Sequence, residues 1–326
     1  MKSLIEQASA FLQDKIRTTP MEFSPELSKL TGHPIYLKLE LLQITGSFKL
    51  RGAFFYLSTL TPAERTQGVA TCSAGNHGLG VAYAAKELHI PCTVFVPKNV
   101  DQAKHDKLLR LGATVKKSAF IGYDDTLEWA TREAAQLSLP MISAFDDEKI
   151  MAANGGTLAV EVLAQVPEAT HFILPMGGGG LAAGFSWHVK SQNPHARISI
   201  CQLAECAALK LSLEKGKPII YMPPIETLAG GLEGGLGEQC FAILKTQVDE
   251  VALIEENELQ SALLWLLEHH QYLIEPTAAV ALASCLFGHV RPSGPTVIVL
   301  TGRNVSYATI RKLVCHPLHS FANHSD

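Results

Sequence analysis

Ile44-Thr45-Gly46-Ser47-Phe48-Lys49-Leu50-Arg51-Gly52-Ala53 is the stretch around which the chain is organised. It follows a strand-like run, residues 35–40, and precedes an apolar helical run, residues 53–57. Lys49 therefore lies near a strand-to-helix junction, between the apolar Phe48 and Leu50. Such surroundings favour the neutral amine, which can attack a carbonyl. For a lone lysine an ordinary surface position is the simpler interpretation, so the other motifs of the chain decide.

Short apolar strands alternate with longer helical patterns along the chain. Strands are expected at residues 35–40, 68–72, 92–97, 114–115, 141–142, 171–174, 198–200 and 296–300. Helices are expected at residues 4–16, from about 76, through 108–109 and at 125–137. This alternation is typical of an α/β fold with parallel sheets covered by helices on both faces. The length of 326 residues corresponds to about two domains.

The composition argues against several classes of protein. A formal net charge of −4 gives no broad basic surface for nucleic acid. The seven cysteines include no C-x-x-C pair, which fits reduced thiols better than a disulfide framework or a zinc site. Glu6 and Asp14 interrupt a signal-peptide pattern, and no apolar run approaches the about 18 residues that span a membrane. We therefore expect a cytoplasmic protein that binds neither nucleic acid nor membrane.

A first polar loop, Ser73-Ala74-Gly75-Asn76-His77-Gly78, directly follows a strand and opens a helix. Its glycines let the backbone approach a ligand closely. The free N–H groups of a helix start attract an anion such as a carboxylate. Taken alone, the loop is better explained as an ordinary capped turn.

A second loop, Gly177-Gly178-Gly179-Gly180, stands between a strand and a helix. Four glycines are costly in chain entropy, and such a loop is suited to enclosing a phosphate. No Gly-Lys-Ser/Thr follows, so it is not a Walker A loop. Residues 177–182 do match G-x-G-x-x-A, but the next strand ends near Gln202 without the acidic residue that binds a ribose. An NAD-dependent oxidoreductase is therefore disfavoured.

A third polar turn, Thr301-Gly302-Arg303-Asn304, follows the last long strand and places a hydroxyl at its carboxyl end. Ligands bind at strand ends of this kind in parallel sheets. An activated lysine, a phosphate loop and a carboxylate-binding helix start are together the parts that hold pyridoxal phosphate and an amino acid.

In this combination and order the chain resembles the threonine/serine dehydratase family of fold type II, tryptophan-synthase-β-like enzymes, which depend on pyridoxal 5'-phosphate. The resemblance runs from about Arg17 to Asn304 and also includes Glu275-Pro276-Thr277-Ala278-Ala279. It implies two domains with twisted, mostly parallel sheets flanked by helices. Residues 1–61 and 148–326 would form the larger, cofactor-binding domain, and residues 62–147 the smaller domain that binds the substrate carboxylate.

The resemblance also implies roles for individual residues. Lys49 would form the Schiff base with the cofactor and later move the Cα proton, and Phe48 would pack beside the ring. Asn76 would bind the phenolic oxygen of the cofactor, Thr301 would face its ring nitrogen, and Glu275 would lie near the ring. The phosphate loop would comprise Gly177, Gly178, Gly179 and Gly180. The substrate carboxylate would be held by Ser73, Ala74, Gly75, Asn76 and His77.

The reaction that the resemblance implies is β-elimination of water from a β-hydroxy amino acid, L-threonine or L-serine, giving a 2-oxo acid and ammonia. The protein would thus be an ammonia-lyase of amino-acid metabolism with a small-molecule substrate, and a homodimer or higher homo-oligomer. Alternatives of the same fold are a 3-hydroxyaspartate dehydratase, a serine racemase and a β-replacement synthase. The lysine and asparagine motifs of cysteine synthases differ from the forms in this chain.

Two departures from the family pattern refine this expectation. Serine racemases of the family have a second serine at the position of Ala74, which acts on the opposite face of the substrate. Alanine has no proton to give, so dehydration without efficient racemisation is expected. Racemase-like relatives also carry an acidic cation site, but residues 201–208 contain a single carboxylate, so no metal site is expected.

The roles of Arg303 and of residues 230–235 each allow more than one interpretation. Arg303 stands where many members of the family have glycine. It is interpreted as a turn residue, while contact with a phosphate or a second substrate carboxylate stays open. The glycines of residues 230–235 indicate a mobile or closely approached loop that could affect the choice of substrate.

Overall fold

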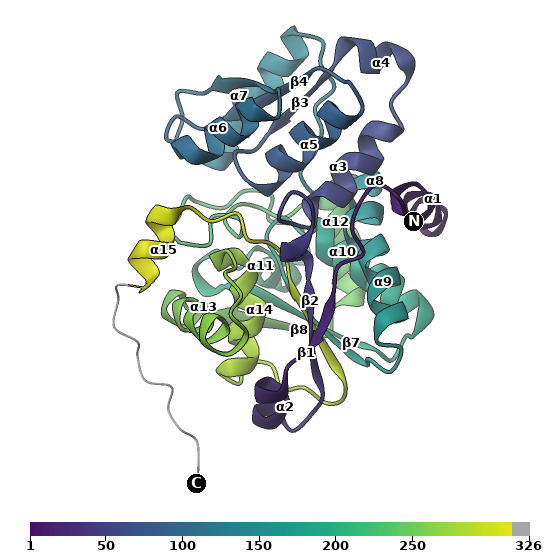
Figure 1. Ribbon diagram of the computed structural model, residues 1–326, viewed down its shortest axis with the longest axis vertical. Helices are drawn as coiled ribbons and strands as arrows, with labels where there is room; N and C mark the ends of the chain where they lie inside the picture. The colour runs from purple at the N-terminus through teal and green to yellow at the C-terminus, as the bar shows by residue number, and fades with distance from the viewer. Residues whose placement is uncertain (315–326) are drawn as a thin grey trace.

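The computed structural model describes residues 1–314, and Cys315 and the residues after it lie outside the described part. Two sheets organise the chain, one above the other in Figure 1. The larger has six strands in the order β1-β2-β9-β6-β7-β8. Their bounds are β1 Met21–Phe23, β2 Ile35–Leu39, β9 Thr296–Leu300, β6 His171–Pro175, β7 Arg197–Leu203 and β8 Glu250–Ile254. Only the β1–β2 pair is antiparallel.

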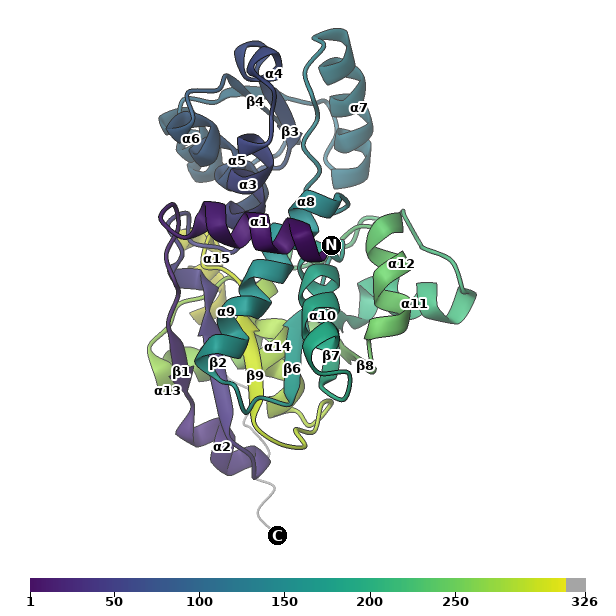
Figure 2. The same cartoon turned by 90° about the vertical axis from the view of Figure 1, so that its right-hand side faces the viewer.

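The six-stranded sheet is buried on both faces, and its central strands are mostly apolar. In β9, Ile298 and Leu300 pack toward one core, whereas Val297 and Val299 pack toward the other, as the two-residue period of a strand requires. The first core is closed by α2 (Pro25–Thr31), α13 (Glu256–His270) and α14 (Pro276–Leu286). The second is closed by α9 (Thr157–Gln165), α10 (Gly180–Gln192), α11 (Ala208–Lys215) and α12 (Glu238–Gln247). Figure 2 shows α9 and α10 in front of this sheet.

The smaller sheet has three parallel strands, β3 (Val69–Cys72), β4 (Cys92–Val96) and β5 (Thr114–Lys117). One face packs on α3 (Lys49–Ser58), α5 (Asn76–Glu87) and α6 (Gln102–Arg110), together with α1 (Lys2–Leu12). The other face packs on α7 (Tyr123–Gln136). The remaining helical elements are α4 (Pro62–Gln67), α8 (Glu148–Met151), α15 (Tyr307–Val314), η1 (Glu40–Leu42), η2 (Ala152–Gly156) and η3 (Ala204–Cys206).

The π-helical segment η2 packs directly against α10 through glycines. A Cβ on Gly184 of α10 would overlap the carbonyl of Met151, and one on Gly155 would overlap the carbonyl of Leu181. These glycines therefore allow two backbones to approach more closely than any side chain would permit. Helix α10, which begins at Gly180, is fixed by this contact.

A buried ion network, which the sequence analysis missed, lies beside the lysine loop. The guanidinium of Arg51 in α3 binds both carboxylate oxygens of Glu40, at 2.6 and 2.9 Å. It also reaches Glu161 of α9 at 2.9 Å, and Glu161 in turn binds Lys38 of β2. Arg51 and Glu40 are fully buried. The network therefore ties the start of α3, and with it Lys49, to the large sheet.

Most of the expected elements are present, and the α/β class with mostly parallel sheets is confirmed. The helix expected at residues 4–16 ends earlier, at Leu12, and Met141 forms only an isolated bridge to Ala70. Strands β1 and β8 were missed. No helix of the described part is long and apolar enough to cross a membrane. The domain boundaries stay a prediction.

Candidate active site

A cavity of about 790 Å³ lies between the strand ends of the two sheets. Every site residue predicted from the sequence lines it. They are Phe48, Lys49, Ser73, Ala74, Gly75, Asn76, His77, Gly177, Gly178, Gly179, Gly180, Glu275 and Thr301. The loops that carry most of them follow β2, β6 and β9 of the large sheet and β3 of the small one. The carboxyl ends of parallel strands meet at one edge of a sheet, which brings the three loops of the large sheet together.

Lys49 is the first residue of α3 and has an unusual electrostatic setting. Its Nζ donates a hydrogen bond to the carbonyl of Ala144 at 2.7 Å and lies 5.2 Å from the centroid of the Phe48 ring. Burial lowers the pKa of the amine to about 8, although the nearby Glu275 opposes this effect. A substantial share of the amine is therefore neutral near physiological pH and able to act as a nucleophile or base.

This lowered pKa predicts how cofactor uptake depends on pH. The rate at which apoprotein mixed with pyridoxal phosphate gains visible absorbance should rise with pH and level off above about 8. Nα-acetyl-lysine, measured in parallel, should keep gaining until about 10.4. A protein curve that follows the free lysine would show that burial does not tune Lys49.

The glycine loop forms a cradle that side chains would fill. Gly179 has φ of +102°, a backbone conformation that favours glycine, and α10 begins at the next residue. A Cβ on Gly180 would lie 2.7 Å from the carbonyl oxygen of Phe145, and one on Gly178 would overlap the Phe145 ring. The first N–H groups of a helix have no partner within it, so they can bind an anion. The loop fits a phosphate group.

A buried hydroxyl faces the same cavity. Thr301 is 3% exposed, and its Oγ1 has no hydrogen-bond partner in the described part of the chain. An unpaired buried hydroxyl is costly unless a ligand completes it. It fits a polar ring atom such as the pyridine nitrogen, as the resemblance implies.

Asn76 begins α5 and is held from two sides. Its Nδ2 donates to Oε1 of Glu275 at 2.6 Å, and its Oδ1 accepts a hydrogen bond from Nδ2 of Asn304 at 2.7 Å. Burial raises the pKa of Glu275, while the bond from Asn76 opposes the shift. Asn304 was not among the predicted site residues, and only its place at the end of the third polar turn could have indicated it.

The start of α5 offers a site for a carboxylate. Its N-cap is Gly75, and the Oγ of Ser73 accepts a hydrogen bond from the N–H of Gly75 at 3.2 Å. Burial, together with the charge of Lys49, lowers the pKa of His77 to about 3, so this imidazole is neutral. The N–H groups at the helix start can therefore bind the anion without a competing charge change at His77.

The structure shows where Arg303 and the glycine-rich loop of residues 230–235 lie relative to the cavity. The N–H of Arg303 donates to the carbonyl of Gly46 at 2.9 Å, and its exposed side chain does not line the cavity. This agrees with the turn interpretation. Gly230 and Gly231 do line the cavity, and a Cβ on Gly177 would overlap the carbonyl of Gly231. The phosphate loop and this second loop thus lie against each other.

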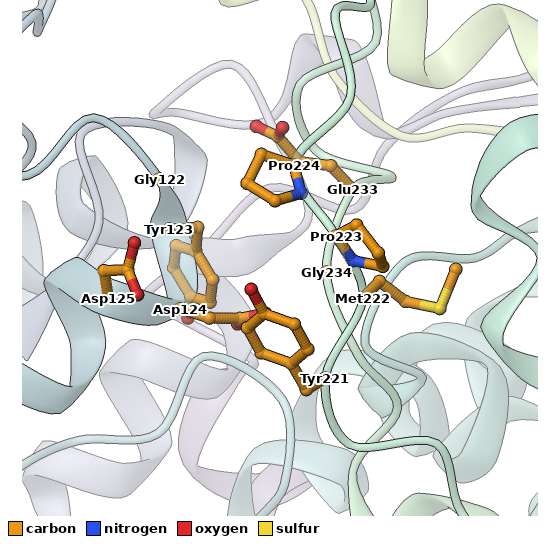
Figure 3. A pocket seen from close by; sticks show the side chains of 10 residues that line it. All are labelled: Gly122, Tyr123, Asp124, Asp125, Tyr221, Met222, Pro223, Pro224, Glu233 and Gly234. Carbon is orange, nitrogen blue, oxygen red and sulfur yellow. The ribbon is translucent and has the colours of Figure 1, made fainter.

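A much smaller pocket lies between the start of α7 and the loop of residues 221–234 (Figure 3). Tyr123, Asp124 and Glu233 line it, and its volume is about 20 Å³. This is room for about one water molecule. It holds neither a cofactor nor an amino acid. In the described residues no group of three or more His, Cys, Asp or Glu side chains is arranged to hold a metal ion.

The buried lysine, the glycine cradle and the unpaired hydroxyl together fit a phosphorylated aldehyde cofactor. The chain belongs to the family of pyridoxal-phosphate dependent enzymes, which it matches over residues 12–302. The cofactor predicted from the sequence is thereby confirmed.

Several individual members of this family are similar to the chain. The chain is 37% identical over 314 residues to an L-threonine ammonia-lyase of Geobacter sulfurreducens, covering 96% of this chain and 77% of that protein. It is 33% identical over 308 residues to the serine racemase of Homo sapiens, covering 92% and 90%. The solved structure of maize serine racemase has a TM-score of 0.89 at 28% identity and covers 96% of each chain. Threonine deaminase isoform 2 from Solanum lycopersicum gives 0.87 at 28% identity, covering 96% of this chain and 92% of that one.

Proposed function

We propose that the protein is an ammonia-lyase that eliminates water from a β-hydroxy amino acid, L-threonine or L-serine, to give a 2-oxo acid and ammonia. The observation that carries the proposal is the placement of Lys49, with its lowered pKa, in one cavity with the start of α5 and the glycine cradle. The threonine ammonia-lyase relatives support the same reaction class.

Each site residue would have its own role in binding or proton transfer. Gly177 to Gly180 would hold the cofactor phosphate, and Thr301 would meet the ring nitrogen with a hydroxyl. When bound, pyridoxal phosphate withdraws electrons from Cα of the substrate. The helix start at Asn76 would hold the substrate carboxylate and orient Cα. The neutral amine of Lys49 would then take the Cα proton, and the resulting ammonium would give a proton to the β-hydroxyl, which would leave as water.

A neutral ring nitrogen favours elimination over transamination. The Thr301 hydroxyl is a poor acid, so it would leave the ring nitrogen of a bound cofactor unprotonated and the electron withdrawal weaker. Prompt loss of the β-hydroxyl is then the favoured outcome. The unsaturated product would be released and hydrolysed to the 2-oxo acid and ammonia.

Ala74 separates this proposal from serine racemisation. Ala74 lines the cavity, and its side chain has no proton to deliver to the second face of the substrate. With L-serine, chiral analysis should find at least about 100-fold less D-serine than 2-oxo acid, since a missing acid or base costs about 10²–10⁴ in rate. Ala74→Ser should raise D-serine formation and the matched Ala74→Gly should not. D-serine produced as fast as 2-oxo acid by the unaltered protein would refute this assignment.

A β-replacement synthase is the other alternative to test. Sulfide added with L-serine or O-acetyl-L-serine should leave 2-oxo acid as the main product and yield little cysteine. Cysteine as the main product would contradict the ammonia-lyase proposal and indicate a β-replacement synthase. A panel of L-serine, L-threonine and 3-hydroxyaspartate then ranks the substrates. The exposed position of Arg303 outside the cavity gives no support to 3-hydroxyaspartate.

The site residues and the domain division are proposed on the same basis. Residues 1–61 with 148–326 would hold the cofactor, and residues 62–147 the substrate carboxylate. A homodimer or higher homo-oligomer and a cytoplasmic location also stay predictions, and sedimentation of the purified protein would test the first of them.

A further inference from the structure

We propose that Asn304 is a positioning residue that fixes the amide of Asn76 with an N–H available to the cofactor. The inference rests on the cofactor site described above but does not depend on which reaction the bound cofactor supports. It concerns a short chain of hydrogen bonds that joins the lysine loop, α5 and the start of α14.

The chain of bonds begins at an acceptor that cannot donate. At one end, Nδ2 of Asn304 donates to the backbone carbonyl of Thr45 at 2.8 Å. At the other end, Nδ2 of Asn76 donates to the carboxylate of Glu275 at 2.6 Å. Between them, Nδ2 of Asn304 donates to Oδ1 of Asn76 at 2.7 Å. A backbone carbonyl only accepts, so the group of Asn304 beside Thr45 must be its NH₂. The second hydrogen of that NH₂ then goes to Oδ1 of Asn76, which turns Nδ2 of Asn76 toward Glu275, so both amide groups have one satisfactory orientation.

This orientation determines what Asn76 can offer to a ligand. Its Oδ1 is occupied by Asn304, and one of its two Nδ2 hydrogens is occupied by Glu275. The second N–H is left for a partner in the cavity that Asn76 lines. If the amide turned over, its oxygen would face the Glu275 carboxylate and its NH₂ would face the NH₂ of Asn304. Asn304 therefore makes the reversed orientation unfavourable.

Asn304 also contacts the lysine loop, which provides a competing explanation. A Cβ on Gly46 would lie 3.2 Å from the Asn304 amide atoms, so this side chain packs tightly on the loop that precedes Lys49. A purely structural role would act through this packing and would not require Asn76. The two explanations differ in whether the effect of Asn304 depends on the side chain of Asn76.

A double-mutant cycle separates them. Apoproteins carrying Asn304→Ala, Asn76→Ala or both are titrated with pyridoxal phosphate, and the dissociation constant is read from the visible absorbance. Loss of one well-placed hydrogen bond should weaken binding about tenfold in Asn304→Ala. In the Asn76→Ala background the same change should weaken binding less than about twofold, because coupled residues are not additive. Asn193→Ala is the matched control. It removes the hydrogen bond that the N–H of His195 donates to Oδ1 of Asn193 at an exposed turn, and it should bind pyridoxal phosphate as tightly as the unaltered protein.

A second variant distinguishes the loss of hydrogen bonds from general damage to the fold. Asn304→Asp keeps the shape of the side chain but removes both donors and places a carboxylate beside two acceptors. It should weaken binding at least as much as alanine, while the unfolding midpoint of the apoprotein reports any general damage. An equal loss in the presence and absence of the Asn76 side chain would overturn the proposal in favour of packing, and so would unchanged binding in Asn304→Ala. A wild-type protein that binds the cofactor but releases no 2-oxo acid would contradict the proposed reaction and leave this test intact.

Discussion

Replacing Lys49 with alanine is expected to abolish the visible absorbance of the bound cofactor and to lower 2-oxo acid release by at least about 10³-fold. Two functions are lost together in this variant. The covalent attachment point disappears, and so does the base that takes the Cα proton. The amine is suited to both functions because burial lowers its pKa to about 8. Absorbance spectra and a 2-oxo acid assay on the same samples measure both losses.

The chain offers a matched control for this variant. Lys149 of α8 lies 5.2 Å from the centroid of the Tyr56 ring, as Lys49 lies from that of Phe48, but it does not line the cavity. Lys149→Ala should keep both the absorbance and the activity. If Lys49→Ala retains the visible absorbance after dialysis against fresh buffer, another lysine carries the cofactor.

Replacing Arg51 with methionine should give the largest loss of stability among single substitutions of polar residues in the described part of the chain. Arg51 holds both oxygens of the fully buried Glu40 and also contacts Glu161. Methionine fills a similar volume but leaves Glu40 as a buried carboxylate without its guanidinium. Breaking a buried pair in this way costs about 3–5 kcal/mol, much of it the penalty of the remaining charge. Urea unfolding of the apoprotein, with unchanged slope, measures the difference.

An exposed ion pair provides the comparison. Arg132 and Glu128 in α7 are more than half exposed, so Arg132→Met should cost less than about 1 kcal/mol. Equal effects of the two substitutions would contradict the account, since burial is what distinguishes the two pairs.

The sign of the pH dependence gives an independent check on Glu40. Burial opposes its ionisation, yet the Arg51 guanidinium holds the pKa of Glu40 below its ordinary value. This stabilisation is fully present above the ordinary carboxyl pKa of about 4.3 and is lost as the pH falls through the folded value. In Arg51→Met the guanidinium is gone, and burial is opposed only by the hydrogen bond from Thr19 and the charge of Lys38, so protonation of Glu40 relieves the penalty. The stability difference between the two proteins should therefore shrink on going from pH 7 to about pH 4.5.

The α/β class and the site loops could be predicted because the relevant signals are local. Buried parallel strands appear as short apolar runs such as residues 296–300, and the polar loops follow them directly. Strand ends of one parallel sheet converge, which brings the loops of Lys49 and Gly177 together. Ser73 follows a strand of the smaller sheet and reaches the same cavity through the arrangement of the two sheets.

The features that were missed depend on contacts between distant segments. Glu40 and Arg51 lie on opposite sides of the lysine loop, but their partner Glu161 belongs to α9, and no periodic pattern links the three. Asn304 likewise gains its meaning only when the fold brings it to Asn76. The close backbone contact between η2 and α10 depends on Gly155 and Gly184, and a single sequence does not reveal which segments these glycines bring together.

The most direct test of the central claim is the product stoichiometry of the purified holoprotein with L-threonine. Ammonia and 2-oxo acid, measured in the same reaction, should appear in a one-to-one ratio without added sulfide, reductant or second amino acid. Lys49→Ala should form neither above background. A holoprotein that retains its visible absorbance but releases no 2-oxo acid from either L-threonine or L-serine would contradict the assignment as an ammonia-lyase.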